Sequence, residues 1–200
     1  MPCFPIERNG SMFDEKYFQK LEEHAGQINE AINAINYLLS INSELMALNV
    51  KVKRISDTEL VFVEREWESK SERKVGWSWR AIIGKKKKKI WRLALSILSG
   101  EAVCGMLFCT GSRHGINVNI RYLEGSPDNS HPLKKFILDI AIQSAEQYAE
   151  SINAKMITIQ NPIQDVVERY IEKGYEYNQK DRRRNNKGLT PMCKTLEKIL

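Results

Sequence analysis

The hydrophobic pattern changes period twice between residues 116 and 177. Apolar and polar residues alternate over 116–122, which is typical of a strand with one buried face. From Leu133 to Tyr148 apolar residues recur every three or four positions, which predicts an amphipathic helix. A short apolar stretch at 156–159 predicts a second strand. Two strands joined by a helix of this length form a right-handed parallel crossover unit, and we expect the rest of the chain to be arranged around it.

Further strands are predicted on both sides of this unit. Residues 90–99 alternate apolar and polar side chains, and Gly100 and Glu101 suit a tight hairpin turn. Residues 102–110 are apolar on both faces, as in a central strand that is covered on both sides. After the unit, the pattern predicts a second helix at 166–171, a strand at 175–178, a basic loop at 180–187 and a last strand or short helix within 190–200.

The first fifty residues predict helices. Ser11 or Asp14 can cap a first helix, and Gly26 is expected to break or kink it. Apolar residues at three- and four-residue steps over 27–48 predict a long amphipathic helix. We expect its apolar stripe to pack on the sheet, and a homodimer contact is the alternative.

The segment 50–84 is less regular. The stretches VKVKRI and LVFVER predict two short strands with a turn between them, and residues 60–63 are expected to form the first strand of the main sheet. The charged residues 64–74 are expected to be exposed. The stretch WSWRAII predicts a short helix that closes at Gly84. Its tryptophans, Trp77 and Trp79, should pack in the core or line a pocket.

Composition changes this picture little. The chain has 200 residues, of which 42% are hydrophobic and 28% charged, and this suits one soluble domain with a full core. The formal charge of +6 favours acidic partners at long range. The four cysteines lack metal-ligand spacing, so we expect reduced thiols and no metal site. No stretch is apolar and long enough for a membrane span, and a cytoplasmic protein is expected.

One segment carries a family resemblance. Residues 161–175, NPIQDVVERYIEKGY, place an asparagine after a strand and a helix that ends in Tyr170, Gly174 and Tyr175. This segment resembles the GCN5-related N-acetyltransferases (the GNAT superfamily), and the order of elements from residue 90 onward is similar to theirs. The resemblance implies an α/β fold with a mixed, mostly antiparallel sheet, a splayed parallel strand pair and flanking helices. Residues 1–57 would then be an N-terminal helical addition packed on a GNAT-like domain at 58–200.

The sequence departs from the family at the pyrophosphate loop, as in a divergent member. The family motif Arg/Gln-x-x-Gly-x-Gly/Ala at the start of the central helix is absent, and Glu-Gly-Ser-Pro-Asp-Asn-Ser-His-Pro occupies 124–132. Pro132 suits a first helical turn, and Ser130 or His131 can cap it. Asp128 would oppose an anion there, and a plain strand-to-helix connection is the alternative.

The resemblance implies acetyl-CoA as the cosubstrate. Its pantetheine arm would fill the gap between the splayed strands, and its pyrophosphate would lie on the amides at the start of the helix. The polar face of the cleft strand, with Asn117, Asn119 and Arg121, is expected to line the cleft or to face solvent. The residues expected to bind the cofactor are Ile120, Tyr122, Gly125, Ser126, Asn129, Ser130, Lys134 and Asn161.

The same resemblance implies transfer of an acetyl group to an unidentified amine. It places Tyr170 as the acid near the leaving sulfur, and Glu124 is the best carboxylate for a base, directly or through water. The alternative is a non-catalytic module that binds a protein or nucleic acid through the basic clusters at 85–89 and 182–184. Nucleic acid is not favoured, because aromatic residues do not interleave the lysines.

Overall fold

The computed structural model describes residues 12–85, 90–112 and 116–200. Within them, seven strands form one sheet in the order β1-β2-β3-β4-β5-β7-β6. All neighbouring strands are antiparallel except β4 and β5, which are parallel and joined by α5. This confirms the predicted crossover unit. The strands are β1 (Val50–Arg54), β2 (Arg92–Ser99), β3 (Ala102–Gly111), β4 (Asn117–Gly125), β5 (Met156–Gln160), β6 (Glu176–Tyr177) and β7 (Thr195–Ile199).

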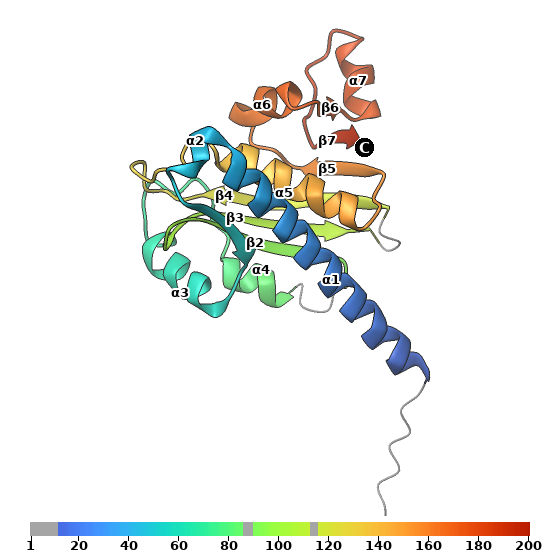
Figure 1. Cartoon of the computed structure of the whole chain (residues 1–200). Coiled ribbons are helices and arrows are strands. Elements are labelled where there is room, and N and C mark those ends of the chain that lie inside the picture. Colours follow the sequence, from blue (N-terminus) through green and yellow to red (C-terminus); the bar gives the residue numbers. More distant parts are fainter. Residues whose placement is uncertain (1–11, 86–89, 113–115) are drawn as a thin grey trace, which may run out of the picture.

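Helices cover both faces of the sheet (Figure 1). On one face α5 packs against the central strands and α1 lies beside it, and on the other face α3 and α4 cover β3. Each face has its own apolar core. The helices are α1 (Met12–Ile41), α2 (Ser43–Met46), α3 (Asp57–Glu66), α4 (Trp79–Lys85), α5 (Ile137–Ser151), the 3-10 turn η1 (Gln164–Val166), α6 (Val167–Glu172) and α7 (Gln179–Asn185).

The first helix continues through Gly26, so the predicted break there is wrong. A glycine costs a helix only about 1 kcal/mol, and the stripe on α1 that includes Ile35 and Leu39 is buried against α5 and β1. The helix ends at Ile41 rather than near Leu48, because Asn42 caps the short helix α2 through its side chain. The apolar stripe is thus covered mainly by α5 and the edge strand β1, within the same chain.

The predicted strand at 60–63 is wrong, because these residues belong to α3. Ser56 and Glu59 form a capping box, in which Glu59 accepts hydrogen bonds from the Ser56 amide and hydroxyl at 2.8 and 2.6 Å. Leu60 and Val63 then face the second core at helical spacing. The first strand of the sheet is β1 instead, so the segment 1–57 contributes a strand as well as helices.

The basic segment after Asn178 is also helical, and not the loop that we expected. The Asn178 side chain accepts hydrogen bonds from the amides of Lys180 and Asp181 and so caps α7. The Asp181 carboxylate accepts a further bond from the Met192 amide at 2.7 Å, which ties α7 to the chain that leads into β7. The predicted last strand is confirmed as β7, which pairs with both β5 and β6.

Three cysteines lie in the described part of the chain, and all are buried and free. Burial raises the pKa of the Cys109 thiol. No helix that the structure describes is both long and apolar enough to cross a bilayer.

Candidate functional site

The parallel pair at the centre of the sheet separates halfway along. Residues 117–120 of β4 pair with residues 156–159 of β5, and no pairing with β5 follows Ile120. A β-bulge marks this point: Phe108 of β3 pairs with Tyr122 and Cys109 with Ile120, which leaves Arg121 as the extra residue. A bulge bends its strand and increases its twist. Residues 122–125 therefore keep β3 on one side, and residues 121–125 have no strand partner on the other.

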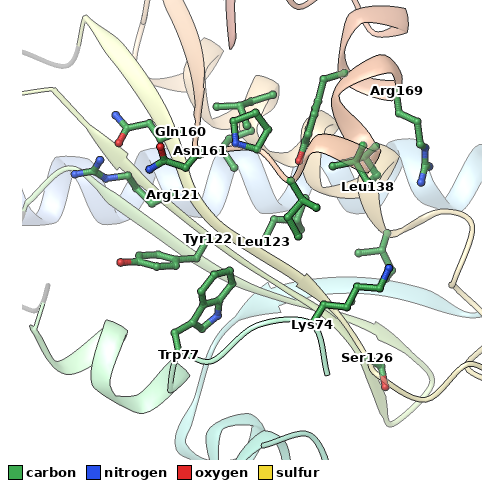
Figure 2. Close-up of a pocket in the computed structure, with 18 of the residues that line it drawn as sticks. Lys74, Trp77, Arg121, Tyr122, Leu123, Ser126, Leu138, Gln160, Asn161 and Arg169 are labelled. Carbon is green, nitrogen blue, oxygen red and sulfur yellow. The ribbon is translucent and has the colours of Figure 1, made fainter. Parts of the chain in front are cut away.

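A cavity of about 600 Å³ opens along this unpaired half of β4. Its walls come from β4, the end of β5, the start of α5, α6 and the segment before α4 (Figure 2). The lining residues are Lys74, Trp77, Ile120, Arg121, Tyr122, Leu123, Gly125, Ser126, His131, Lys134, Ile137, Leu138, Ile159, Gln160, Asn161, Pro162, Ile163, Val166, Arg169 and Tyr170.

Seven of the predicted cofactor and catalytic residues line this one cavity. They come from β4, from the connection to α5, from the residue after β5 and from α6. They are Ile120, Tyr122, Gly125, Ser126, Lys134, Asn161 and Tyr170. The structure therefore brings together residues that the sequence spreads over fifty positions.

The start of α5 forms the basic end of the cavity, with Lys74, His131, Lys134 and Arg169. Figure 2 shows Lys74, Ser126 and Arg169 on the same side of the cavity. The N-cap position of α5 is Phe136, whose side chain makes no capping hydrogen bond. The first amides of α5 therefore have no side-chain cap, and Ile137 and Leu138 of that turn line the cavity. Cations beside a helix N-terminus make a site suited to an anion.

His131 contributes an imidazole to this end. Its Nδ1 atom is buried and has no hydrogen-bond partner in the described residues. Burial is the main cause that lowers the pKa of His131 below its usual 6.5, so the ring is neutral at neutral pH. The predicted cap at Ser130 or His131 is wrong, because turns occupy 132–136 and α5 begins only at Ile137.

Asn129 and Ser130 do not line the cavity. The Ser130 amide and hydroxyl both donate to the Asp128 carboxylate, at 2.8 and 2.7 Å. These hydrogen bonds lower the pKa of Asp128, which is therefore ionised at neutral pH. The tip of the connection is held by its own polar contacts, and we do not retain Asn129 and Ser130 as cofactor ligands.

Tyr170 lines the cavity from α6. Its side chain is 4% exposed and packs edge-to-face on Tyr175, with ring centroids 6.1 Å apart. Burial raises the pKa of Tyr170 to about 12, so the phenol keeps its proton at neutral pH. A protonated hydroxyl at a cavity wall suits a proton donor.

Glu124 has a different position from the one expected for a base. Its carboxylate accepts two hydrogen bonds from Arg73, at 2.6 and 3.0 Å, and one from the Trp79 indole at 2.6 Å. Its side chain is 6% exposed and does not line the cavity. Because donors occupy both oxygens, the geometry argues against Glu124 as a base. Arg73 lies in the segment expected to be exposed, and that expectation is wrong for this residue.

The Arg73–Glu124 pair positions the segment before α4, which forms the cavity wall opposite β4. Arg73 also donates to the Trp77 carbonyl at 2.7 Å. Its chain neighbour Lys74 and the nearby Trp77 both line the cavity. The expectation that Trp77 and Trp79 pack in the core or line a pocket is confirmed for both: Trp77 lines the cavity, and Trp79 is fully buried in the second core.

Several lining residues were not singled out from the sequence. Lys74 lies in a charged run that gives no sign of its position, and Arg169 lies one residue before the motif tyrosine. Gln160 ends β5, where the parallel strands part. On the polar face of β4, Arg121 lines the cavity, whereas Asn119 bonds to Thr110, Thr158 and Gln160 between the strands.

The described residues do not support the alternative of a basic binding surface. Arg182 pairs with Glu176 and Glu197, and Arg184 donates to the Thr190 carbonyl. Lysines 86–89 lie outside the described residues.

Solved structures share this architecture at low sequence identity. PaiA N-acetyltransferase from Thermoplasma acidophilum, in complex with coenzyme A, is 13% identical, with a TM-score of 0.52 over 76% of this chain and 99% of its own. An acetyltransferase from Thermus thermophilus is 12% identical, with a TM-score of 0.52 over 76% and 98%. Spermidine N-acetyltransferase from Vibrio cholerae, in complex with CoA and spermine, is 8% identical, with a TM-score of 0.50 over 65% and 82%.

No family model matches the sequence, and no curated protein is similar to it at the sequence level. The structural likenesses define the class as an α/β fold of the acetyltransferase type. This is the fold that the resemblance to the GCN5-related N-acetyltransferases implied. The predicted fold class is confirmed, including the parallel pair that splays.

Proposed function

We propose that this chain transfers an acetyl group from acetyl-CoA to an amine. The observation that carries the proposal is the half of β4 at 121–125, which loses its parallel partner where the cavity opens. A ligand that adds like a strand can bond to such backbone groups, and the amides of the pantetheine arm suit this role. Structures of the same fold contain coenzyme A, and we extend that ligand to this chain.

The basic end of the cavity fits the phosphates of such a ligand. Lys74, Lys134 and Arg169 supply three positive charges. The first turn of α5 has no side-chain cap and adds backbone donors beyond the Ile137 amide, which already bonds to the Leu133 carbonyl. The Nδ1 atom of His131, which has no partner among the described residues, would form a further hydrogen bond to these phosphates. These groups would take the place of the missing family motif, with side-chain charge replacing part of the glycine-rich amide cradle.

The reaction requires little covalent chemistry from the protein. The nitrogen lone pair of a neutral amine attacks the thioester carbonyl carbon, and the carbon–sulfur bond breaks. Tyr170 gives its proton to the departing thiolate, and the surplus proton of the amine returns to Tyr170 through water. No carboxylate is among the residues that line the described cavity, so water rather than Glu124 receives the amine proton. Orientation of the amine beside the thioester provides much of the rate enhancement.

Replacement of Tyr170 tests this mechanism. Tyr170→Phe should lower kcat about 100-fold, because it removes the proton donor, while the Kd for acetyl-CoA stays unchanged. Tyr175→Phe is the matched control: it removes the phenol hydroxyl of a neighbouring buried tyrosine, whose ring does not line the cavity. Stopped-flow release of the CoA thiol and calorimetric titration measure the two quantities. Equal rates for the wild type and Tyr170→Phe would remove Tyr170 from the mechanism.

Binding of the cofactor is tested first and without an acceptor. At 100 times its Kd, a ligand that binds only the folded state adds about 2.7 kcal/mol to the free energy of unfolding. The melting temperature should therefore rise with acetyl-CoA. An unchanged melting temperature at millimolar acetyl-CoA would exclude the proposed function.

A further inference from the structure

The cavity has a second end, where the acceptor amine would lie if the proposed function is correct. Figure 2 shows Trp77, Arg121 and Tyr122 together on the side opposite Lys74, Ser126 and Arg169. The bulge residue Arg121 begins the unpaired half of β4. This aromatic end (Trp77, Arg121 and Tyr122) therefore adjoins the point where the strands part, away from the basic end.

The charge of the lining excludes one class of acceptor. Four lysine and arginine side chains and one histidine line the described cavity, and no aspartate or glutamate does. The carboxylate of Glu124, on the cavity strand β4, is already neutralised by Arg73. A diamine or polyamine carries positive charges that need carboxylates to offset their loss of water. The charged side chains of this lining therefore disfavour such a ligand.

Arg121 lacks the partner that an arginine in such a position usually has. Its side chain is half-buried, and it makes no ion pair or hydrogen bond within the ranges that the structure describes. The neighbouring polar side chain Asn119 is instead fully engaged between the strands. A guanidinium presents a planar fork of donors that matches a carboxylate in bidentate fashion. Arg121 is therefore suited to receive one carboxylate from a ligand.

Trp77 and Tyr122 form a flat apolar wall beside it. Their rings meet edge-to-face with centroids 5.2 Å apart. The Trp77 Nε1 atom is buried and has no acceptor among the described residues. A buried donor without a partner costs free energy that a ligand oxygen would recover. The wall therefore suits an apolar or aromatic group attached close to a polar one.

From these three features we infer that the acceptor is an amine that also carries a carboxylate and an apolar side group, as a free aromatic or aliphatic α-amino acid does. The carboxylate pairs with Arg121, the side group packs on Trp77 and Tyr122, and the amine points toward the thioester. Arg121 is then the residue that sets acceptor specificity.

A panel of matched amines tests this inference, with the full chain and acetyl-CoA. L-Phenylalanine, L-phenylalaninamide and spermidine are compared by thiol release, and their binding to the CoA-loaded protein is measured by calorimetry. Phenylalanine should exceed its amide about 30-fold in kcat/KM, and spermidine should neither bind nor react. Preference for the amide or for spermidine, or no binding of phenylalanine, would overturn the inference.

Variants at Arg121 separate charge from folding. Arg121→Met should lower kcat/KM for phenylalanine about 100-fold and leave that for phenylalaninamide unchanged, because only the former has a carboxylate. Arg121→Lys should recover part of the loss, since it restores charge without the fork. The rise in melting temperature with CoA confirms that each variant is folded. Equal losses for both acceptors would contradict the inference. If the chain binds acetyl-CoA and acetylates spermidine, the inference about the acceptor is wrong but the proposed function stands. If the chain does not bind acetyl-CoA, the proposed function itself is wrong.

Discussion

The two ends of the cavity are constructed in different ways. At the basic end, Lys74, Lys134 and Arg169 are exposed side chains from three separate segments. At the aromatic end, Trp77, Arg121 and Tyr122 are half-buried, and two of them belong to a central strand. Salt screens exposed charges, and their contacts tolerate loose geometry. A packed wall tolerates little change in geometry. One cavity thus combines a general site for phosphate with a shaped site for a particular partner.

Arg73 connects the two ends. It directly precedes Lys74, which lines the basic end, and it donates to the carbonyl of Trp77, which lines the aromatic end. It also binds the buried carboxylate of Glu124. Replacement of this arginine should disturb both ends together, whereas other changes should affect only one.

The largest effect is expected for Arg73→Met. It leaves the Glu124 carboxylate buried without its cation, and loss of one partner of a buried pair costs about 3–5 kcal/mol. Urea unfolding measures the change. Arg80→Met is the control, because its bonds to Glu64 and Asp57 are exposed to solvent and contribute little to stability. The double variant Arg73→Met with Glu124→Leu should be more stable than Arg73→Met alone. Equal losses for Arg73→Met and Arg80→Met would show that the buried pair does not hold this wall.

A smaller effect is expected at the basic end. Joint replacement of Lys134 and Arg169 by alanine should raise the Kd for CoA roughly 30-fold, because two charge-assisted contacts to phosphate are lost. The wild type should also lose affinity as salt is increased, and the double variant should lose less. Lys135→Ala is the control, since Lys135 is exposed beside Lys134 and does not line the cavity. An equal change in the control would mean that only net charge matters. Calorimetric titration at two salt concentrations measures both effects.

The smallest of these three effects is expected for Trp77, at the aromatic end. Trp77→Phe keeps an aromatic wall but removes the buried Nε1 donor, which corresponds to one hydrogen bond of about 1 kcal/mol. The KM for the acceptor should rise about fivefold, while the Kd for CoA stays the same. A rise in the CoA Kd as large as the rise in KM would contradict the separation of the two ends. Steady-state kinetics and titration together decide between these results.

Much of the fold could be predicted because local patterns determine it. Alternation in β2 and β4, the apolar run of β3 and the helical period of α5 predicted the correct elements and the crossover between parallel strands. The strand expected at 60–63 was wrong because a capping box outweighed apolar residues of high strand propensity. That signal, Ser56 followed three residues later by Glu59, is visible in the sequence.

The site was predictable only where it depends on local sequence. Gly125, Lys134 and Asn161 lie next to element ends, and the motif around Tyr170 places that residue on the cavity wall. The pairing of Glu124 was not predictable, because Arg73 is 51 residues away and only tertiary packing brings the two together. A carboxylate at the end of a strand has the same appearance in the sequence whether it is free or paired.

The contact between α1 and α5 has a consequence for synthesis of the chain on the ribosome. The His24 imidazole and the Tyr148 hydroxyl, 2.7 Å apart, are separated by 124 residues. At about 5–20 residues per second, translation reaches Tyr148 roughly 6–25 seconds after His24. Two elements, β1 and α5, cover the apolar stripe of α1, and during that interval α5 is not yet complete. The nascent chain therefore presents a partly uncovered apolar helix for many seconds, as a substrate for chaperones that bind such surfaces.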